Sequence, residues 1–335
     1  MNKKILIIGA TGAMAVYLIP CLLEKGYEID GISLDDVVSN HERLKYIKAD
    51  AMDIQFLETI LKNKYDAIVD FMVYNSVELY SKYYKLFLDN TSHYIFLSTY
   101  RVYAGDYPLK ETSKRLLDVE KPDNFVSEYE YSIYKAQEED LLRSSPYKNY
   151  TIIRPAITYS KRRFQLVTLE ADVLIWRMFN NKTVLLPKGA MDKQATMSWA
   201  GDVAKMISCI ILNPKAMCET YTVSTSEHMT WREVAKIYEE IGNLKYKIVD
   251  DDVFINIVFD GDIKCSQQLY YDRCFNRIVD NSKILSLCNM KQEELMKLKD
   301  GLKMEFSNLS PGDILCNNEI NERIDNYLNS QNGEE

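Results

Sequence analysis

Residues 4–15 read KILIIGATGAMA, an apolar run followed at once by a glycine-rich loop. The run at 4–8 is typical of a strand that is buried on both faces. In the loop, Gly9 permits a tight turn, Gly12 lets the backbone approach a pyrophosphate, and Ala15 is small enough for a helix to pack on the strand. The pattern predicts dinucleotide binding, with a plain strand–helix turn as the alternative. We expect the phosphates to lie against Gly9, Thr11, Gly12, Ala13 and Met14.

The next 150 residues alternate between strand and helix patterns. Further strands are expected at 27–33, 46–50, 66–73, 93–99 and 150–156, and helices at 16–26, 56–63, 76–90 and 128–145. This alternation predicts an α/β fold with a Rossmann-type, doubly wound parallel sheet. We assign the first domain to residues 1–155 and a smaller mixed α/β lobe to 156–330. A later strand near 220–225 is expected to rejoin the sheet.

The end of the second expected strand should show which nicotinamide cofactor is bound, because an acidic residue there binds the adenosine ribose of NAD. Ser33 holds that place, with Asp35 and Asp36 just beyond it. A serine does not repel the 2′-phosphate of NADP, but the nearest arginine, Arg43, is too distant to mark NADP. NAD and NADP both stay open, with a slight preference for NADP that the two aspartates weaken.

Composition argues against several classes of protein. The formal net charge of −8 disfavours a nucleic-acid partner, because phosphate binding needs a basic face. The seven cysteines are scattered and the three histidines lie far apart, so we expect neither a disulfide framework nor a metal site. No apolar run approaches the roughly 18 residues of a membrane span, and the N-terminal run is too short for a signal peptide. We expect a cytoplasmic protein without a membrane partner.

A tyrosine and a lysine lie four residues apart in the expected helix 128–145. At this spacing Tyr131 and Lys135 share one helix face. An ammonium near a phenol lowers the phenol pKa from about 10, so the phenol can exchange a proton with a sugar hydroxyl near neutral pH. The same lysine can bind the nicotinamide ribose. Because the chain has 24 tyrosines, such a pair also arises by chance, and two ordinary helix neighbours are the alternative.

Several segments resemble extended short-chain dehydrogenases/reductases, which include the NAD-dependent epimerases and dehydratases of nucleotide sugars. They are GATGAMA near the start, then DAMD, LSTYRVYAG, YSIYK and IIRPAITY, in the family's order. The segments DAIVDFMVYN and NSKIL are similar to an atypical branch. The resemblance covers about residues 3–240. It implies a bound NAD or NADP, a C-terminal substrate-binding lobe and a nucleotide sugar as substrate.

The resemblance also implies roles for single residues. Thr99 would hydrogen-bond the reacting hydroxyl, with its neighbour Ser98 as a substitute. Tyr131 would be the general acid/base and Lys135 its tuner. Arg154 matches the turn that leads into the substrate-binding lobe, so we expect it at the substrate.

At the cofactor, Asp50 and the adjacent Ala51 match the contact to adenine. The chain also departs from the family's pattern. Tyr100 and Arg101 replace the Asp-Glu pair that drives water elimination, which argues against a 4,6-dehydratase. Asp70 stands where the family has an apolar wall near the nicotinamide, and its role is unexplained.

A further departure concerns the substrate phosphate. Ala195 replaces an arginine that grips it in many nucleotide-sugar enzymes. Lys193, Arg162 or Arg163 could supply the missing charge, and a different substrate is the alternative.

The residues and the resemblance together predict an NAD(P)-dependent epimerase or ketoreductase that acts on a nucleotide-linked sugar. The alternative is a non-catalytic dinucleotide-binding protein with a regulatory or RNA-associated role. A homodimer through the Tyr131 helix and the segment 76–90 stays open, although the aromatic residues there could equally be ordinary core.

Overall fold

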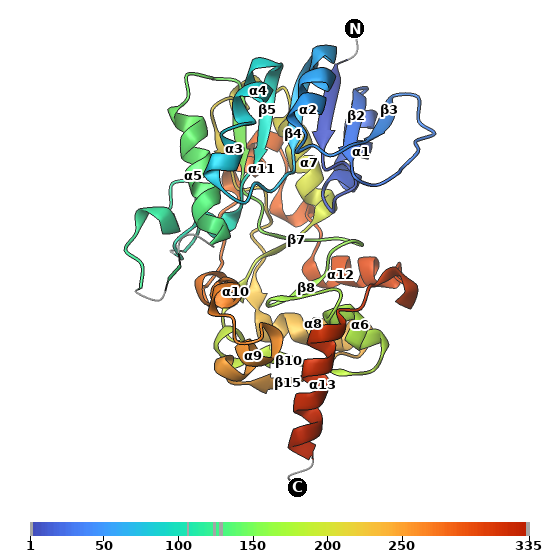
Figure 1. Cartoon of the computed structure of the whole chain (residues 1–335), viewed down its shortest axis with the longest axis vertical. Coiled ribbons are helices and arrows are strands. Elements are labelled where there is room, and N and C mark those ends of the chain that lie inside the picture. The colour runs from blue at the N-terminus through green and yellow to red at the C-terminus, as the bar shows by residue number, and fades with distance from the viewer. Residues whose placement is uncertain (1–2, 106, 123–124, 127–129, 333–335) are drawn as a thin grey trace.

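The computed structural model describes residues 3–105, 107–122, 125–126 and 130–332. Figure 1 shows two lobes: a sheet lobe, in which helices flank a parallel sheet, and a lower lobe, which includes the C-terminal helix α13. Residues 128 and 129, the start of one expected helix, lie outside the described residues. That helix, α5, runs from Tyr131 to Ser144.

Seven parallel strands form the sheet, in the order β13-β6-β5-β4-β1-β2-β3. The order confirms the predicted Rossmann-type sheet, and its direction reverses between β1 and β4. At such a switch point the carboxyl ends of the strands form a crevice that binds ligands. The strands are β1 (Lys4–Ile8), β2 (Glu28–Ser33), β3 (Leu44–Lys48), β4 (Tyr65–Asp70), β5 (Thr91–Leu97), β6 (Tyr150–Ile153) and β13 (Thr220–Tyr221).

Helices cover both faces of the sheet. One face packs against α1 (Ala15–Glu24), α7 (Ala200–Ile210) and α11 (Ser282–Cys288). The other packs against α2 (Ile54–Ile60), α3 (Val77–Tyr80), α4 (Tyr84–Asp89) and α5. Tyr80, Tyr83 and Tyr84 are buried in this second layer. The aromatic residues of the segment 76–90 are therefore part of the core.

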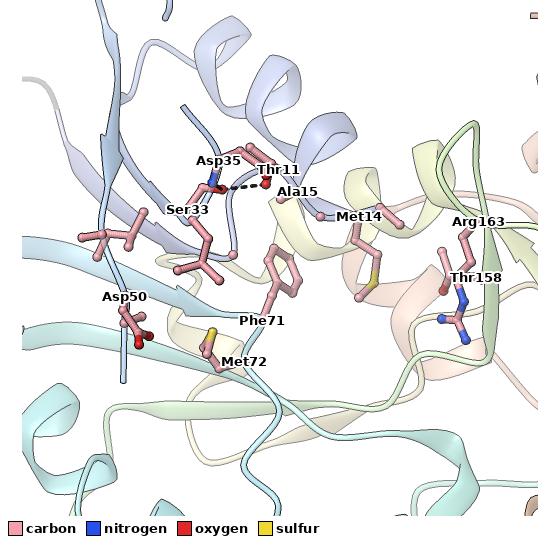
Figure 2. Close-up of a pocket in the computed structure, with 17 residues that line it drawn as sticks. Thr11, Met14, Ala15, Ser33, Asp35, Asp50, Phe71, Met72, Thr158 and Arg163 are labelled. Carbon is pink, nitrogen blue, oxygen red and sulfur yellow. Dashed lines mark hydrogen bonds between the residues drawn. The ribbon is translucent and has the colours of Figure 1, made fainter. Parts of the chain in front are cut away.

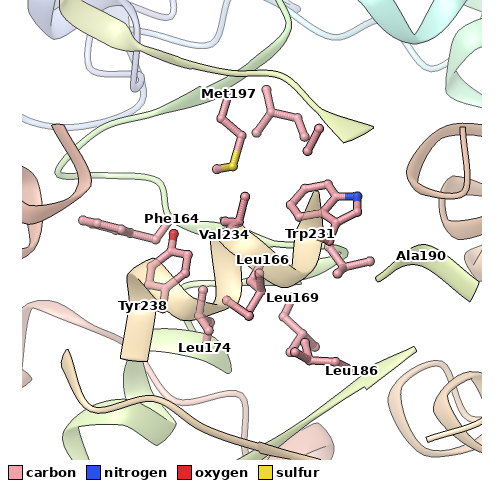
Figure 3. Packing of buried hydrophobic residues seen from close by; sticks show 14 of the residues in the cluster. Phe164, Leu166, Leu169, Leu174, Leu186, Ala190, Met197, Trp231, Val234 and Tyr238 are labelled. Carbon is pink, nitrogen blue, oxygen red and sulfur yellow. The ribbon is translucent and has the colours of Figure 1, made fainter. Parts of the chain in front are cut away.

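The lower lobe has its own apolar core, centred on α8 (Trp231–Gly242) (Figure 3). Trp231, Val234 and Tyr238 of this helix are buried, and Thr230 with Glu233 forms a capping box at its start. Burial of each large apolar side chain contributes about 1.5–3 kcal/mol, so α8 anchors the lobe. The other helices of the C-terminal half are α6 (Leu174–Phe179), α9 (Asp251–Val258), α10 (Ile263–Gln268), α12 (Leu298–Ser307) and α13 (Asn318–Asn332).

Short strand pairs complete the C-terminal half. β7 (Ile157–Tyr159) pairs in parallel with β12 (Met197–Trp199) at the junction of the lobes (Figure 1). The remaining pairs are β8 (Gln165–Leu166) with β9 (Leu169–Glu170), β10 (Thr183–Pro187) with β15 (Lys245–Val249), and β11 (Gln194–Ala195) with β14 (Met229–Thr230). Within the described part of the chain, no helix has both the length and the apolar character needed to cross a bilayer.

Candidate active site

The loop between β1 and α1 is fixed tightly over the end of β2. The N–H groups of Gly9 and Ala10 both donate to the carbonyl of Ile32, at 3.0 and 2.9 Å. Gly9 has φ +79°, a conformation that favours glycine. A Cβ on Gly12 would lie 3.1 Å from the Gly9 carbonyl oxygen. The conformation of Gly9 therefore favours glycine, and a side chain at Gly12 would press on the carbonyl of Gly9.

A cavity of about 390 Å³ lies beside this loop, and we call it the loop cavity (Figure 2). Every residue expected to bind the cofactor lines it except Lys135. Those that do are Gly9, Thr11, Gly12, Ala13, Met14, Ser33, Asp50 and Ala51.

The charges around the loop cavity are uneven. Asp35 and Asp50 line it toward the ends of β2 and β3, and Figure 2 shows Asp50 and Arg163 at opposite ends. Arg163 is the cation among the lining residues. The hydroxyls of Thr11 and Ser33 lie 2.7 Å apart, and Ser33 Oγ also accepts the N–H of Asp35 at 3.0 Å. The carboxylate end suits ribose hydroxyls, and the arginine end suits phosphate.

A second cavity, of about 350 Å³, adjoins the first, and we call it the tyrosine cavity. Thr99 and Tyr131 line it together. Three residues line both cavities, namely Met14, Thr158 and Arg163. A molecule bound against the glycine loop can therefore reach a molecule bound at the tyrosine.

The cation over the Tyr131 ring is Arg101. Its guanidinium carbon lies 5.2 Å from the ring centre, and the guanidinium donates to the carboxylate of Glu130 at 2.7 Å. Glu130 is the N-cap of α5 and also accepts the N–H of Ser132, so the start of the helix fixes Arg101 in place. The sequence marks Arg101 as a departure from the pattern of the dehydratases, but it does not predict that the guanidinium lies beside the phenol of Tyr131.

Lys135 lines neither cavity. Its ammonium donates to the carbonyl of Leu97 at 3.0 Å and pairs with Glu138 at 2.9 Å, and both charged side chains are fully buried. Burial raises the pKa of Glu138 to about 7, although the Lys135 charge opposes this shift. The predicted tuner of the phenol therefore has a carboxylate as its partner.

Two of the residues expected at the substrate belong to a buried ion-pair network. Arg154 makes a two-pronged contact with Glu139, at 2.8 and 2.6 Å, and is 1% exposed. The structure does not place Arg154 in either cavity, because Glu139 holds it inside the sheet lobe. Ser98 does line the tyrosine cavity, and its hydroxyl donates to the same Glu139.

The candidate phosphate-binding cations separate in space. Arg162 is exposed and lines a different cavity together with Asp172 and Asp313. Lys193 is half-buried in the lower lobe and lines neither of the two adjoining cavities. Of the three candidate cations, Arg163 is the one that lines both the loop cavity and the tyrosine cavity.

One further cation at the site, Arg273, has no local signal in the sequence. Its side chain is nearly buried and lines the tyrosine cavity. Arg273 Nε donates to the carbonyl of Val167 at 2.7 Å, and Nη2 donates to Gln165 at 2.9 Å. Arg273 follows α10 in the chain, and these bonds connect it to β8 and to the turn between β8 and β9. Such a long-range contact cannot be predicted from local sequence patterns. Among the described residues, no group of three or more His, Cys, Asp or Glu side chains is arranged to hold a metal ion.

A family model identifies the protein class. The model of the NAD dependent epimerase/dehydratase family matches residues 5–224, more than half of the chain. The chain belongs to this family. The match includes residues of all seven strands of the sheet and every residue that lines the loop cavity, so the resemblance seen in the sequence motifs is confirmed. Curated protein sequences give no match.

Solved structures share the fold at low sequence identity. A UDP-N-acetylglucosamine 4-epimerase from Methanobrevibacter ruminantium, in complex with UDP-N-acetylmuramic acid, is 20% identical with a TM-score of 0.68. The UDP-glucose 4-epimerase of Thermotoga maritima, with UDP-glucose, is 18% identical with a TM-score of 0.65. Both alignments cover 91% of this chain and 97% of the other. A Bacillus cereus UDP-glucuronic acid 4-epimerase, with UDP-glucuronic acid and NAD, is 16% identical over 91% and 98%, with a TM-score of 0.65.

The slight preference for NADP finds no support. The family is described as NAD dependent, and the Bacillus cereus structure contains NAD. Asp35 and Asp50 at one end of the loop cavity agree with this, because carboxylates repel a 2′-phosphate.

Proposed function

We propose that the protein binds NAD in the loop cavity and uses it for hydride transfer on a nucleotide sugar, as a 4-epimerase or 4-ketoreductase. One observation carries the proposal: the loop cavity and the tyrosine cavity share Met14, Thr158 and Arg163. A dinucleotide along the glycine loop would thus end beside Thr99 and Tyr131.

The loop cavity suits NAD in shape and charge. A Cβ at Gly12 would fill the space against the Gly9 carbonyl, so the loop keeps room for a closely approaching phosphate. Ser33, Asp35 and Asp50 would hold the adenosine end, with carboxylates that accept ribose hydroxyls. When bound, NAD supplies the acceptor and donor of the hydride.

Thr99 and Tyr131 would move and orient the proton. Tyr131 takes the proton from the sugar hydroxyl as the carbinol is oxidised, and returns it when the ketone is reduced. Thr99 Oγ accepts the N–H of Arg101 at 3.2 Å, and the described residues supply no acceptor for its hydroxyl hydrogen. That hydrogen is left to orient the same substrate oxygen. Arg101 lies over the Tyr131 ring, where we expect it to assist the proton transfer.

The substrate class follows from the charge of the tyrosine cavity. Arg101, Arg163 and Arg273 line it with one carboxylate, Glu170. Two of these arginines have carboxylate partners outside the lining, Glu130 for Arg101 and Asp272 for Arg273. Arginine recognises phosphate in a two-pronged manner, so the cavity suits a diphosphate-linked sugar. The UDP-sugars named for the solved relatives support the same class.

The test is turnover of a panel of UDP-hexoses, UDP-hexuronic acids and UDP-N-acetylhexosamines, with NAD present and products separated by chromatography. We expect at least one member to be converted by the wild type. Tyr131→Phe should lose about 10²–10⁴-fold in rate without a change in NAD affinity. The control is Tyr134→Phe, whose ring lies 5.4 Å from that of Tyr131 but outside both cavities. If the wild type converts none of these UDP-sugars, or if Tyr131→Phe keeps full activity, the proposal is refuted.

A further inference from the structure

Two cysteines lie side by side in the helix layer that α1, α7 and α11 form on one face of the sheet. Cys209 is close to the C-terminal end of α7, and Cys288 is the last residue of α11. The two helices pack against each other, and a hydrogen bond joins the two thiols. Both residues keep partial solvent exposure. The proposed function uses neither of them, so what they do can be tested independently of it.

A contact with the backbone of α7 fixes the position of the Cys288 sulfur. Cys288 Sγ donates to the carbonyl oxygen of Met206 at 3.9 Å. Met206 precedes Cys209 by three residues, so both lie on one face of the helix, and the Cys209 side chain tilts back toward the turn that Met206 begins. The contact with Met206 and the hydrogen bond between the thiols therefore place both sulfurs over the same turn of α7.

A lysine places positive charge beside the two thiols. The ammonium of Lys25, the residue that ends α1, donates to the carbonyl of Ser208 at 2.5 Å, directly before Cys209. The hydrogen bond from Cys288 lowers the pKa of the Cys209 thiol, and the Lys25 charge lowers it further, although burial opposes both effects. The same hydrogen bond raises the pKa of Cys288, and burial adds to the rise. Cys209 is therefore the cysteine that favours the thiolate, which is the reactive form.

We propose that Cys209 and Cys288 are a site of reversible oxidation by hydrogen peroxide, at which a disulfide joins α7 to α11. The Cys209 thiolate attacks one peroxide oxygen, an S–O bond forms, the O–O bond breaks, and the leaving hydroxide takes up a proton to become water. The Cys288 thiol then attacks the sulfur of the resulting sulfenic acid and loses its proton, and a second water leaves as the S–S bond forms. Two thiols are thus oxidised to one disulfide while one peroxide is reduced to two waters.

Other thiols of the chain have different partners. Cys21 on α1 donates to the carbonyl of Tyr17 at 3.4 Å, within its own helix. Cys218 donates to the carbonyl of Lys148 at 3.3 Å and is exposed. If exposure alone decided which cysteine reacts with peroxide, Cys218 would react before Cys209. Cys218 is therefore a suitable control for the effect of exposure.

Peroxide treatment of the folded wild type tests the site directly. The protein is oxidised with hydrogen peroxide, its remaining thiols are blocked with iodoacetamide, and it is digested with trypsin without a reductant. Cleavage after lysine releases residues 206–215 and 284–291, each with a single cysteine. We expect mass spectrometry to find these two peptides linked, and dithiothreitol to separate them. Absence of the linked peptides, or linkage of either one to a different cysteine instead, would overturn the proposal.

Serine variants separate the roles of the two cysteines, and the wild-type mapping stands whether or not they fold. In Cys288→Ser the sulfenic acid of Cys209 has no thiol to react with, so dimedone, which captures sulfenic acids, should label residues 206–215. In Cys209→Ser the labelling of Cys288 should be at least about tenfold weaker, because burial keeps that thiol protonated. Cys218→Ser should form the cross-link to the wild-type extent. Equal labelling of Cys209 and Cys288, or loss of the cross-link in Cys218→Ser, would overturn the proposal.

Discussion

The guanidinium carbon of Arg101 lies 5.2 Å from the centre of the Tyr131 ring, at the N-terminal end of α5. Both residues line the tyrosine cavity. The carboxylate of Glu130 lies 2.7 Å from Nη2 of Arg101, and that of Asp272 lies 3.7 Å from its Nε. We propose that Arg101, which lines the tyrosine cavity beside Tyr131, acts on the phenol in place of Lys135, which lines neither cavity.

Replacing Arg101 tests that assignment. We expect Arg101→Gln to lower kcat about tenfold, because the group that moves the proton loses the cation beside it. Arg143→Gln is the matched control, since Arg143 lies near the other end of α5 and pairs there with Glu139 and Asp140. An unchanged kcat in Arg101→Gln would remove the arginine from the mechanism.

The glycine loop can be tested without any substrate. Gly12→Val places side-chain atoms against the Gly9 carbonyl and over the cavity, so NAD affinity should fall at least about tenfold. Gly312→Val is the control, because a Cβ there meets nothing within 4 Å. Calorimetric titration with NAD measures both. Equal NAD affinity in Gly12→Val and the wild type would mean that the dinucleotide does not lie on this loop.

The choice between NAD and NADP is attributed to the carboxylates near Ser33. Asp35 lines the loop cavity, whereas Asp36 is exposed, pairs with Lys48 and does not line it. We expect the wild type to prefer NAD at least about tenfold, and Asp35→Ser to narrow that preference because a repulsive charge is removed. Asp36→Ser should leave the preference as it is. The ratio of the two dissociation constants is the readout, and a wild type that prefers NADP would contradict the charge argument.

A buried histidine makes the fold sensitive to acid. His93 Nδ1 accepts the N–H of Leu212 at 2.9 Å, so Nε2 carries the hydrogen and donates to Thr151 at 2.8 Å. Burial lowers the pKa of His93 to about 4, and its side chain is fully enclosed. Between pH 6.5 and about 4 the unfolded chain therefore binds the extra proton, and the folded protein loses stability as the pH falls.

Across that window we expect His93 to remove about 3 kcal/mol from the free energy of unfolding. His93→Gln should flatten this part of the stability–pH curve, while His41→Gln, at an exposed histidine, should keep the wild-type slope. Urea unfolding at several pH values measures the slope. An unchanged slope in His93→Gln would place the acid sensitivity elsewhere.

Local patterns predicted the sheet lobe well because its signals are local. The run before Gly9, the spacing to Gly12 and the alternation of strands and helices each depend on neighbouring residues. The cofactor side of the site follows for the same reason, since Ser33, Asp50 and Ala51 end or follow neighbouring parallel strands. Parallel strands bring such positions to one edge of the sheet.

The substrate side was predicted less well because its geometry depends on long-range packing. Arg154 and Lys135 were assigned to the site by motif, but buried partners, Glu139 and Glu138, hold both side chains. Glu138 lies three residues after Lys135 on α5, a spacing that allows the pair, whereas Glu139 meets Arg154 only through tertiary packing. Arg273 reaches the cavity from beyond α10 by contacts that have no local signature.

The measurement that tests the account most directly is the cofactor content of the purified protein. The protein is incubated with an equimolar mixture of NAD and NADP, freed of unbound nucleotide and denatured, and the released cofactor is identified by mass spectrometry. The account predicts about one NAD per chain, little NADP, and loss of both in Gly12→Val. Retention of neither nucleotide by the wild type, or equal retention by Gly12→Val, would contradict it.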